Sequence, residues 1–170
     1  MTTTDHTACD SPGSATYLPP GLPAPLDEEG VAAPYWNGLR DSVLRVQRCA
    51  HCATWQFGGE WLCHHCHAFD PAWVEVAPEG HIYSWERVWH PVHPLLKDHG
   101  PYLAVLVELP NAGGLRMLGN LLGDPMQQVV IGAEVQGVFE HHAAGVAASG
   151  HCAVTASEQP AYSLLQWRLR

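Results

Sequence analysis

Two CxxC pairs, Cys49-Ala50-His51-Cys52 and Cys63-His64-His65-Cys66, constrain the fold of this chain more than any other feature of its sequence. Each short turn aims two thiolates at one point, and two such turns facing each other supply four sulfur ligands. Zinc accepts a tetrahedron of this kind at a metal–sulfur distance of about 2.3 Å, and four protein ligands leave no open position for catalysis. The pairs therefore predict a small ribbon built around one structural zinc ion, held by Cys49, Cys52, Cys63 and Cys66.

Two other uses of these cysteines stay open. They can be ordinary buried or disulfide-bonded cysteines, and four thiolates in a ribbon also suit the single iron ion of an electron carrier. The chain starts without a basic segment followed by an apolar stretch, so we expect no secretory signal and a reducing, cytoplasmic location. Such a compartment favours thiolates over disulfides and leaves Cys9 and Cys152 as unpaired extras.

The residues around the pairs predict the rest of the ribbon. Pro34 suits a first helical turn, and the apolar spacing that follows predicts a short amphipathic helix from Ala33 to Asp41. Residues 43–48 alternate in polarity and predict a strand that leads into the first pair. A ribbon this small has little core, so its aromatic residues are expected to form one beside the metal: Trp55, Phe57 and Trp61, with Gly58-Gly59 as the turn. The neighbouring histidines are expected to be exposed rather than ligands: His51, His64, His65 and His67.

Composition limits the size and the partners of the protein. The chain has 170 residues, of which 46% are hydrophobic, so it fits one domain or two small ones. No apolar run approaches the roughly 18 residues of a membrane span. With 17 acidic and 8 basic residues the net charge is −9, which repels phosphate backbones and argues against nucleic acid as a partner. Residues 1–32 are rich in Thr, Ser, Pro and Gly, and predict either a disordered or a partner-clasping arm.

From residue 72 the pattern changes to short strands separated by turns. Strands are predicted at 73–76, 80–88, 102–109, 115–122, 133–140 and 162–169, with one helical turn possible at 124–130. This run predicts a small OB-fold barrel over residues 72–170, and a β-sandwich is the alternative. Alternation within 80–88 predicts one face made of Ile82, Ser84, Glu86 and Val88, and an opposite face made of Tyr83, Trp85 and Arg87.

Two connections are long for so small a barrel. The loop Trp89–Gly100 carries His90, His93 and His99, which raises the alternative of a second metal site. No carboxylate stands beside these histidines at a recognisable spacing, so we favour a partner-facing or lid loop. The second connection, 141–160, is rich in Ala, Gly and Ser and predicts a flexible excursion before the last strand.

In this order, the motifs resemble a family of zinc-ribbon and OB-fold proteins associated with acyl-CoA enzymes, first catalogued as a domain of unknown function. The resemblance covers about residues 33–170. It rests on the ribbon and on these segments: Tyr35–Arg40, Leu44–Cys49, Gly80–Ser84, Pro101–Leu109, Arg116–Leu121 and Ile131–Val135. The chain departs from the family in two respects. In the ribbon, Ala53 and His67 follow the CxxC pairs where the family usually has glycine, and Gly58-Gly59 stands where proline is frequent. The Ala/Gly-rich segment 143–150 is also longer than the usual connection of the family.

The resemblance implies a mainly β protein, with a helix and a rubredoxin-like zinc ribbon over residues 33–71 and an OB-fold over residues 72–170. It also implies a non-catalytic accessory subunit of a hetero-oligomer. Its partner would be a thiolase, a thiolase-like aldolase or a hydratase acting on CoA thioesters, including those of steroid side-chain and aromatic degradation. The partner would carry the catalytic residues, and the CoA thioester would be shared with it.

The sequence itself agrees with an accessory role, because no nucleophile–base pair and no glycine-rich phosphate loop is recognisable in it. A subunit of an acyl-CoA hydratase complex and a rubredoxin-like electron carrier stay open as alternatives. Seven tryptophans are many for two small modules, and aromatic residues are preferred anchors of interfaces. The expected partner contacts are Tyr35, Trp36, Trp89, His90, His93 and Trp167.

Overall fold

The computed structural model describes residues 16–19, 21, 22, 24, 30–146 and 158–170. Its ribbon side holds α1 (Ala33–Arg40), β1 (Leu44–Arg48), β2 (Trp55–Gln56) and β3 (Ala72–Val76). Its barrel side holds β4 (Glu79–Val88), η1 (Pro94–Leu96), β5 (Tyr102–Leu109), η2 (Pro110–Ala112), β6 (Leu115–Asn120), β7 (Glu134–His142), β8 (Gly145–Val146), β9 (Glu158–Gln159) and β10 (Tyr162–Leu169). No helix within these described ranges is long and apolar enough to cross a membrane.

Helix α1 forms where the sequence predicts it. Pro34 stands in its first turn, and the helix ends at Arg40 with Asp41 as the capping residue. Leu39 is completely buried, and the neighbouring aromatic residues of the helix pack against the same core. The apolar stripe of the helix is therefore covered by the rest of the chain.

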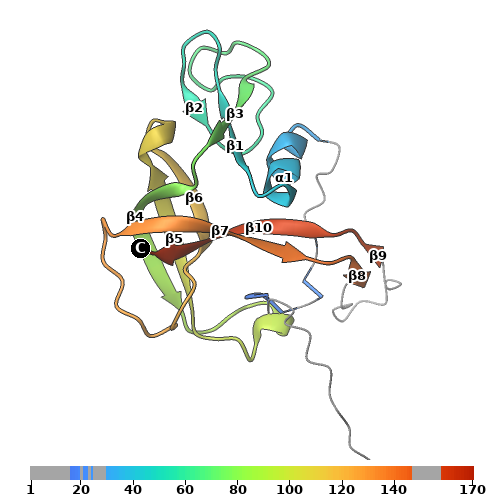
Figure 1. Cartoon of the computed structure of the whole chain (residues 1–170), viewed down its shortest axis with the longest axis vertical. Helices are drawn as coiled ribbons and strands as arrows, with labels where there is room; N and C mark the ends of the chain where they lie inside the picture. Colours follow the sequence, from blue (N-terminus) through green and yellow to red (C-terminus); the bar gives the residue numbers. More distant parts are fainter. Residues whose placement is uncertain (1–15, 20, 23, 25–29, 147–157) are drawn as a thin grey trace, which may run out of the picture.

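The ribbon is a three-stranded sheet in the order β2-β1-β3 (Figure 1). Strand β3 pairs with β1 along its whole length, from Leu44 opposite Val76 to Arg48 opposite Ala72. The segment expected as a first barrel strand thus completes the ribbon sheet and then continues into β4. A domain boundary at residue 72 stays a prediction.

The barrel is nearly closed and has OB-fold topology, with strands in the order β10-β7-β4-β5-β6. Its seam joins the end of β6 to β10 by a parallel bridge between Leu121 and Trp167. There the Leu122 N–H donates to the Trp167 carbonyl oxygen over 2.7 Å. Gly119 makes the closure possible, because a Cβ at this position would lie 2.8 Å from the Trp167 indole. The predicted OB-fold is confirmed, and the β-sandwich alternative is wrong.

The predicted faces of the strand 80–88 are wrong beyond Tyr83. The register of β4 against β5 shifts between Ile82 and Ser84, where a β-bulge inserts Tyr83 as an extra residue. Ile82 and Trp85 consequently both face the core, opposite the buried Val107 and Val105. Strict alternation cannot anticipate such a bulge, since it inverts every side chain that follows.

Three connections also differ from the predictions. The segment 124–130 was predicted to form one helical turn, but it contains a non-helical turn. In this turn the Gln127 N–H donates to the Asp124 carbonyl oxygen. In the loop 89–100, a short 3-10 helix, η1, interrupts the irregular backbone. The predicted excursion at 141–160 is shorter at both ends, because β7 reaches His142 and β8 pairs with β9. Its middle, 147–157, lies outside the described residues, as does most of the predicted arm 1–32.

Candidate metal centre and exposed aromatic surface

The four cysteines of the CxxC pairs meet in the ribbon, as the sequence predicts. Their Sγ atoms all lie within 4.8 Å of one another. The Sγ atoms of Cys49 and Cys66 are 3.5 Å apart, as are those of Cys52 and Cys63. All four are free cysteines rather than disulfides. Four sulfur donors converging in this way fit a tetrahedral, thiophilic metal ion.

Both CxxC pairs adopt the same knuckle conformation. The Ala53 N–H donates to the Cys49 carbonyl oxygen over 3.0 Å, and the His67 N–H donates to that of Cys63 over 2.9 Å. The residue after each pair is left-handed, with φ at 59° for both Ala53 and His67. These are the two positions where the family usually has glycine. The knuckles therefore keep their shape although the left-handed conformation costs more free energy for alanine and histidine than for glycine.

Two buried glutamines hold the second knuckle against the first hairpin. Gln47 donates to the Glu60 carbonyl oxygen over 2.9 Å and accepts from the Glu60 N–H over 2.8 Å. Gln56 donates to the Leu62 carbonyl oxygen over 3.2 Å and accepts from the His64 N–H over 3.3 Å. Sequence reasoning missed both residues, because Gln47 is polar and lies on the face of β1 opposite the buried Leu44 and Val46.

The thiols of the cluster differ in acidity. The pKa of Cys52 is lowered to about 5, first by a hydrogen bond with the Thr54 hydroxyl and then by the Thr54 N–H. At Cys66 the Ala68 N–H lowers the pKa, but Cys52, burial and the remaining sulfurs outweigh it and raise the pKa to about 12. Four thiolates this close repel one another, so a bound cation is needed for all four to be ionised together.

The histidines contribute no ligand to this centre. Those beside the ribbon are exposed, as predicted: His51, His64, His65 and His67. Among the residues that the structure describes, the four cysteines are the one group of His, Cys, Asp or Glu side chains placed to share a metal ion. The alternative of a second metal site at His90, His93 and His99 therefore finds no support. His93 instead caps η1, with its Nδ1 accepting from the Leu95 N–H over 3.3 Å.

Tyr35 and Trp36, two of the expected partner contacts, are partly buried within the chain. The Tyr35 ring meets the rings of Trp36 and Phe57 edge-on, at centroid distances of 4.9 and 5.3 Å. Burial raises the pKa of Tyr35 to about 12. Trp167 is completely buried in the barrel seam, so its side chain is not accessible to a partner in the chain as folded here.

Other aromatic side chains are exposed instead. The predicted aromatic core of the ribbon holds only for Trp55, which packs at the barrel beside Gly113. Phe57 and Trp61 are 41% and 66% exposed, and Phe69 of the second knuckle is 73% exposed. Interior positions of the ribbon are taken instead by Gln47 and Gln56, and these rings lie on the surface. Sequence reasoning did not single out Phe69.

The loop after β4 also exposes apolar side chains, as its predicted partner role requires. Trp89 is 55% exposed and Val92 is completely exposed. His90 is exposed and His93 is half-buried. Of the expected contacts, Trp89 and His90 are thus accessible, while His93 is accessible in part.

Comparison with known sequences identifies relatives of part of this chain. Residues 73–140 match the family described as the C-terminal OB-fold domain of ChsH2. A protein of Thermomonospora curvata, named probable enoyl-CoA hydratase alpha subunit, is 39% identical over 101 residues. That alignment covers 59% of this chain but 30% of the relative, so the chain spans less than a third of that protein.

Comparison with solved structures extends the match to both modules. A chain of the solved Ltp2-ChsH2(DUF35) aldolase superposes with a TM-score of 0.62 at 28% identity, covering 85% of this chain and 98% of that one. A DUF35 protein of unknown function from Sulfolobus solfataricus has the same fold, with a TM-score of 0.51 at 21% identity over 65% of this chain and 78% of its own. The resemblance to the family of zinc-ribbon and OB-fold proteins is confirmed.

Proposed function

Because the chain resembles DUF35 proteins in both its ribbon and its barrel, we propose that it is a non-catalytic accessory subunit of a complex that processes acyl-CoA thioesters. Its partner is a thiolase-fold enzyme, and a thiolase-like aldolase is the first candidate. The partner supplies the catalytic residues, while this chain shapes the assembly and helps to accommodate the acyl-CoA.

One observation carries this proposal. The chain covers 98% of a chain of the Ltp2-ChsH2(DUF35) aldolase at 28% identity, and that name joins a DUF35 protein to Ltp2 in an aldolase. Nearly the whole of that chain therefore has a counterpart here. The four-cysteine centre is consistent with the same role, because a site closed by four protein ligands builds structure and leaves no position for a substrate.

A hydratase complex is the second candidate. The relative from Thermomonospora curvata is named as a hydratase subunit and is 39% identical. The aligned part is 30% of that protein, so the hydratase activity itself can lie in the part without a counterpart in this chain. The two candidates differ in the enzyme that co-purifies and in the reaction that the complex catalyses.

In the proposed complex, Cys49, Cys52, Cys63 and Cys66 hold one zinc ion and keep the ribbon folded. The partner covers the exposed loop around Trp89, with His90 and His93 beside it, and the exposed ribbon rings Trp61 and Phe69. Aromatic residues are frequent anchors at the centres of interfaces. A permanent assembly of this kind buries roughly 2,000 Å² or more.

The direct test is purification of the tagged chain from its native host at physiological salt. We expect a stoichiometric acyl-CoA enzyme to co-elute and to be identified by mass spectrometry. The partner expressed alone should be inactive or insoluble and should regain turnover when this chain is added. A chain that elutes as a monomer without an acyl-CoA enzyme would contradict the proposal.

The metal separates the electron-carrier alternative from this proposal. A ribbon that binds iron colours the pure protein red, whereas zinc leaves it colourless. We expect colourless protein with one zinc per chain by elemental analysis. Iron in the protein as isolated from the native host, with reversible reduction, would instead favour the electron carrier.

A further inference from the structure

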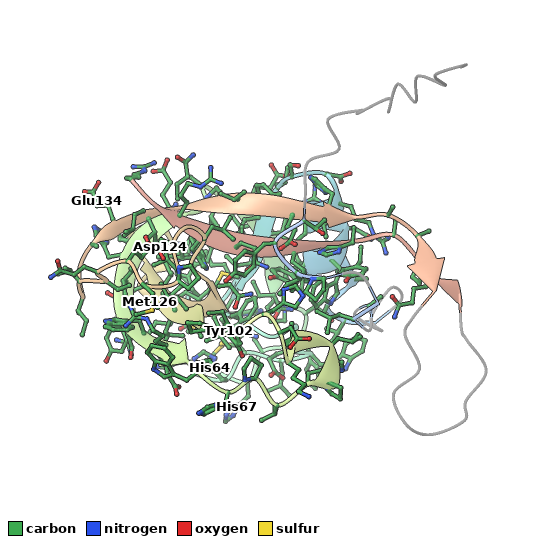
Figure 2. All side chains as sticks on the ribbon, turned by 90° about the horizontal axis from the view of Figure 1, so that it is seen from below. His64, His67, Tyr102, Asp124, Met126 and Glu134 are labelled. Carbon is green, nitrogen blue, oxygen red and sulfur yellow. The ribbon has the colours of Figure 1, made fainter. Side chains whose placement is uncertain are left out.

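A cavity of about 290 Å³ lies between the barrel and the N-terminal arm, by which we mean the described residues Thr16–Pro19, Gly21 and Leu22. The arm runs beside η1, at the end of the molecule away from the ribbon (Figure 1). Figure 2 views the molecule from this end, and the labelled Tyr102 lies near the middle of that view. Ten residues line the cavity: Tyr17, Leu18, Pro19, Leu22, Leu96, His99, Pro101, Tyr102, Asn120 and Pro125.

The lining of this arm cavity combines apolar walls with a few polar groups. Leucine and proline side chains come from the arm, from the loop before β5 and from the turn after β6. The Tyr17 and Tyr102 hydroxyls have no hydrogen-bond partner among the described residues, so they are available to a ligand. Small-molecule sites are concave, mainly apolar and marked by a small number of polar groups of this kind, and their volumes run from roughly 300 Å³ upward.

The charges around the cavity disfavour an anion. No lysine or arginine is among the lining residues. The carboxylate of Glu140, which is 8% exposed, lies behind the arm. Burial first, and then the charge of Glu140, raise the pKa of Tyr17. A negatively charged ligand would find no lysine or arginine in the lining, and the carboxylate behind the arm would disfavour it further, so a neutral molecule fits better.

The arm is a fixed wall of the cavity because a buried network holds it. The Leu18 N–H donates to Glu140 Oε1 over 2.8 Å, and Gln166 Nε2 donates to Glu140 Oε2 over 2.7 Å. The Oε1 atom of Gln166 accepts from the N–H of Asn120, itself a lining residue, over 3.0 Å. The network thus runs from the cavity wall through the barrel to the arm. His142 Nε2 also lies 3.1 Å from Glu140 Oε1. Buried hydrogen bonds of this kind favour one arrangement of the groups that they join.

We propose that the arm cavity binds a neutral, mainly apolar small molecule that carries a polar group able to bond the two tyrosine hydroxyls. The proposal goes beyond the accessory role above and needs no partner enzyme. It also separates this site from the metal centre, since none of the four cysteines lines the cavity.

A pair of matched fluorescent probes tests the proposal on the full chain. N-phenyl-1-naphthylamine is neutral, and anilinonaphthalene sulfonate is the same ring system with an anionic group. We expect saturable binding of the neutral probe, and an affinity for the sulfonate lower by about tenfold or more, since the lining offers no lysine or arginine to its charge. Equal affinities would indicate general adsorption to exposed apolar surface and would overturn the proposal, as would an absence of binding by the neutral probe.

Three variants locate the probe. Leu96→Trp should fill the cavity and weaken binding about tenfold or more, and Tyr17→Ala, which removes an arm wall without touching the barrel core, should do the same. Ile131→Ala removes an apolar side chain that is 67% exposed and absent from the lining. This variant should therefore bind the neutral probe with the affinity of the parent. Circular dichroism and melting curves check that each variant is folded. Unchanged affinity in a folded Tyr17→Ala variant would overturn the assignment to this cavity.

Discussion

Gln56 Nε2 lies 3.3 Å from Gln47 Oε1 inside the ribbon, and the two residues are only 2% and 1% exposed. A larger protein would fill such positions with apolar side chains. Here the two amides pair with each other and with the backbone of residues 60, 62 and 64. The second knuckle is therefore tied to β1 by hydrogen bonds in addition to the metal that both knuckles can share.

Replacing Gln47 by alanine should weaken the metal centre without touching a ligand. The N–H and the carbonyl of Glu60 would lose their buried partners, and each such loss costs about 1–3 kcal/mol. We expect a lower melting temperature and faster zinc loss to a chelator, followed with a chromogenic zinc indicator. Gln128→Ala, at an exposed position, is the matched control and should behave as the parent. Parent-like zinc release in Gln47→Ala would show that the amides are dispensable.

Removing one thiolate should remove the metal. Cys52→Ser is expected to lose zinc and to unfold the ribbon, because binding energy and folding energy are coupled in a small metal module. Most residues of the buried core belong to the barrel side, so the barrel should stay folded, with β-sheet signals retained in the far-ultraviolet spectrum. Cys9→Ser, outside both CxxC pairs, should keep one zinc per chain. Zinc retained at parent stoichiometry in Cys52→Ser would contradict the four-cysteine assignment.

Replacing Ala53 by glycine should stabilise the zinc-loaded protein. Ala53 has φ at 59°, and a left-handed alanine costs roughly 1–2 kcal/mol, part of which the greater backbone entropy of glycine offsets. We expect a net gain of about 1 kcal/mol in denaturant unfolding of the ribbon. Ala50→Gly, at an exposed position whose φ is not positive, should give no gain. If both variants lose stability alike, strain at Ala53 is not the cause.

Replacing Gly119 by alanine should open the barrel seam. The added Cβ would lie 2.8 Å from the Trp167 indole, which is fully buried and cannot swing aside. Overpacking of this kind costs roughly 1–3 kcal/mol, so the melting temperature should fall and Trp167 fluorescence should shift to longer wavelength. Gly145→Ala, whose nearest neighbour would be 4.0 Å away, is the control. A parent-like melt for Gly119→Ala would mean that the seam is wider than described.

Replacing Trp89 by alanine should weaken the complex and leave the subunit stable. Trp89 is 55% exposed, so its removal costs the isolated chain little, whereas an interface anchor contributes about 2 kcal/mol or more. Co-elution with the partner should fall, with an unchanged melting temperature. Trp36→Ala should lower the melting temperature and leave co-elution unchanged, because Trp36 packs against the core. Tyr83→Ala, which removes another exposed aromatic ring, controls for general loss of surface.

Most of the fold could be predicted from local sequence patterns. The CxxC spacing locates all four sulfur donors, since each pair is defined by a turn of its own backbone. The strands around Ile82, Val105 and Val135 follow from apolar periodicity, which reports one-sided burial. The bulge at Tyr83 could not be predicted in this way, because it is defined by the register of β4 against β5, a distant segment of the chain.

What escaped prediction depends on contacts between distant residues. Gln47 and Gln56 are polar, so periodicity assigns them to the surface, yet backbone groups of another hairpin satisfy them in the interior. Trp61 was expected inside for the opposite reason, as an apolar residue in a small module. The burial of Trp167 required knowing that Gly119 lies against it. The arm cavity depends on the contact between Leu18 and Glu140, which no local sequence pattern predicts.

The seam between Leu121 and Trp167 also sets an order of events during synthesis. All the ribbon strands and all four cysteines lie before residue 77 in the sequence. The metal module can therefore assemble while later residues are still being translated. The barrel cannot close until β10 has left the ribosome, because β10 pairs with β7 and forms one side of the seam. Until then the apolar faces of β5 and β6 have no cover from Trp167. The nascent chain thus passes through a stage in which a finished ribbon precedes an open sheet, and that stage is the one most exposed to aggregation.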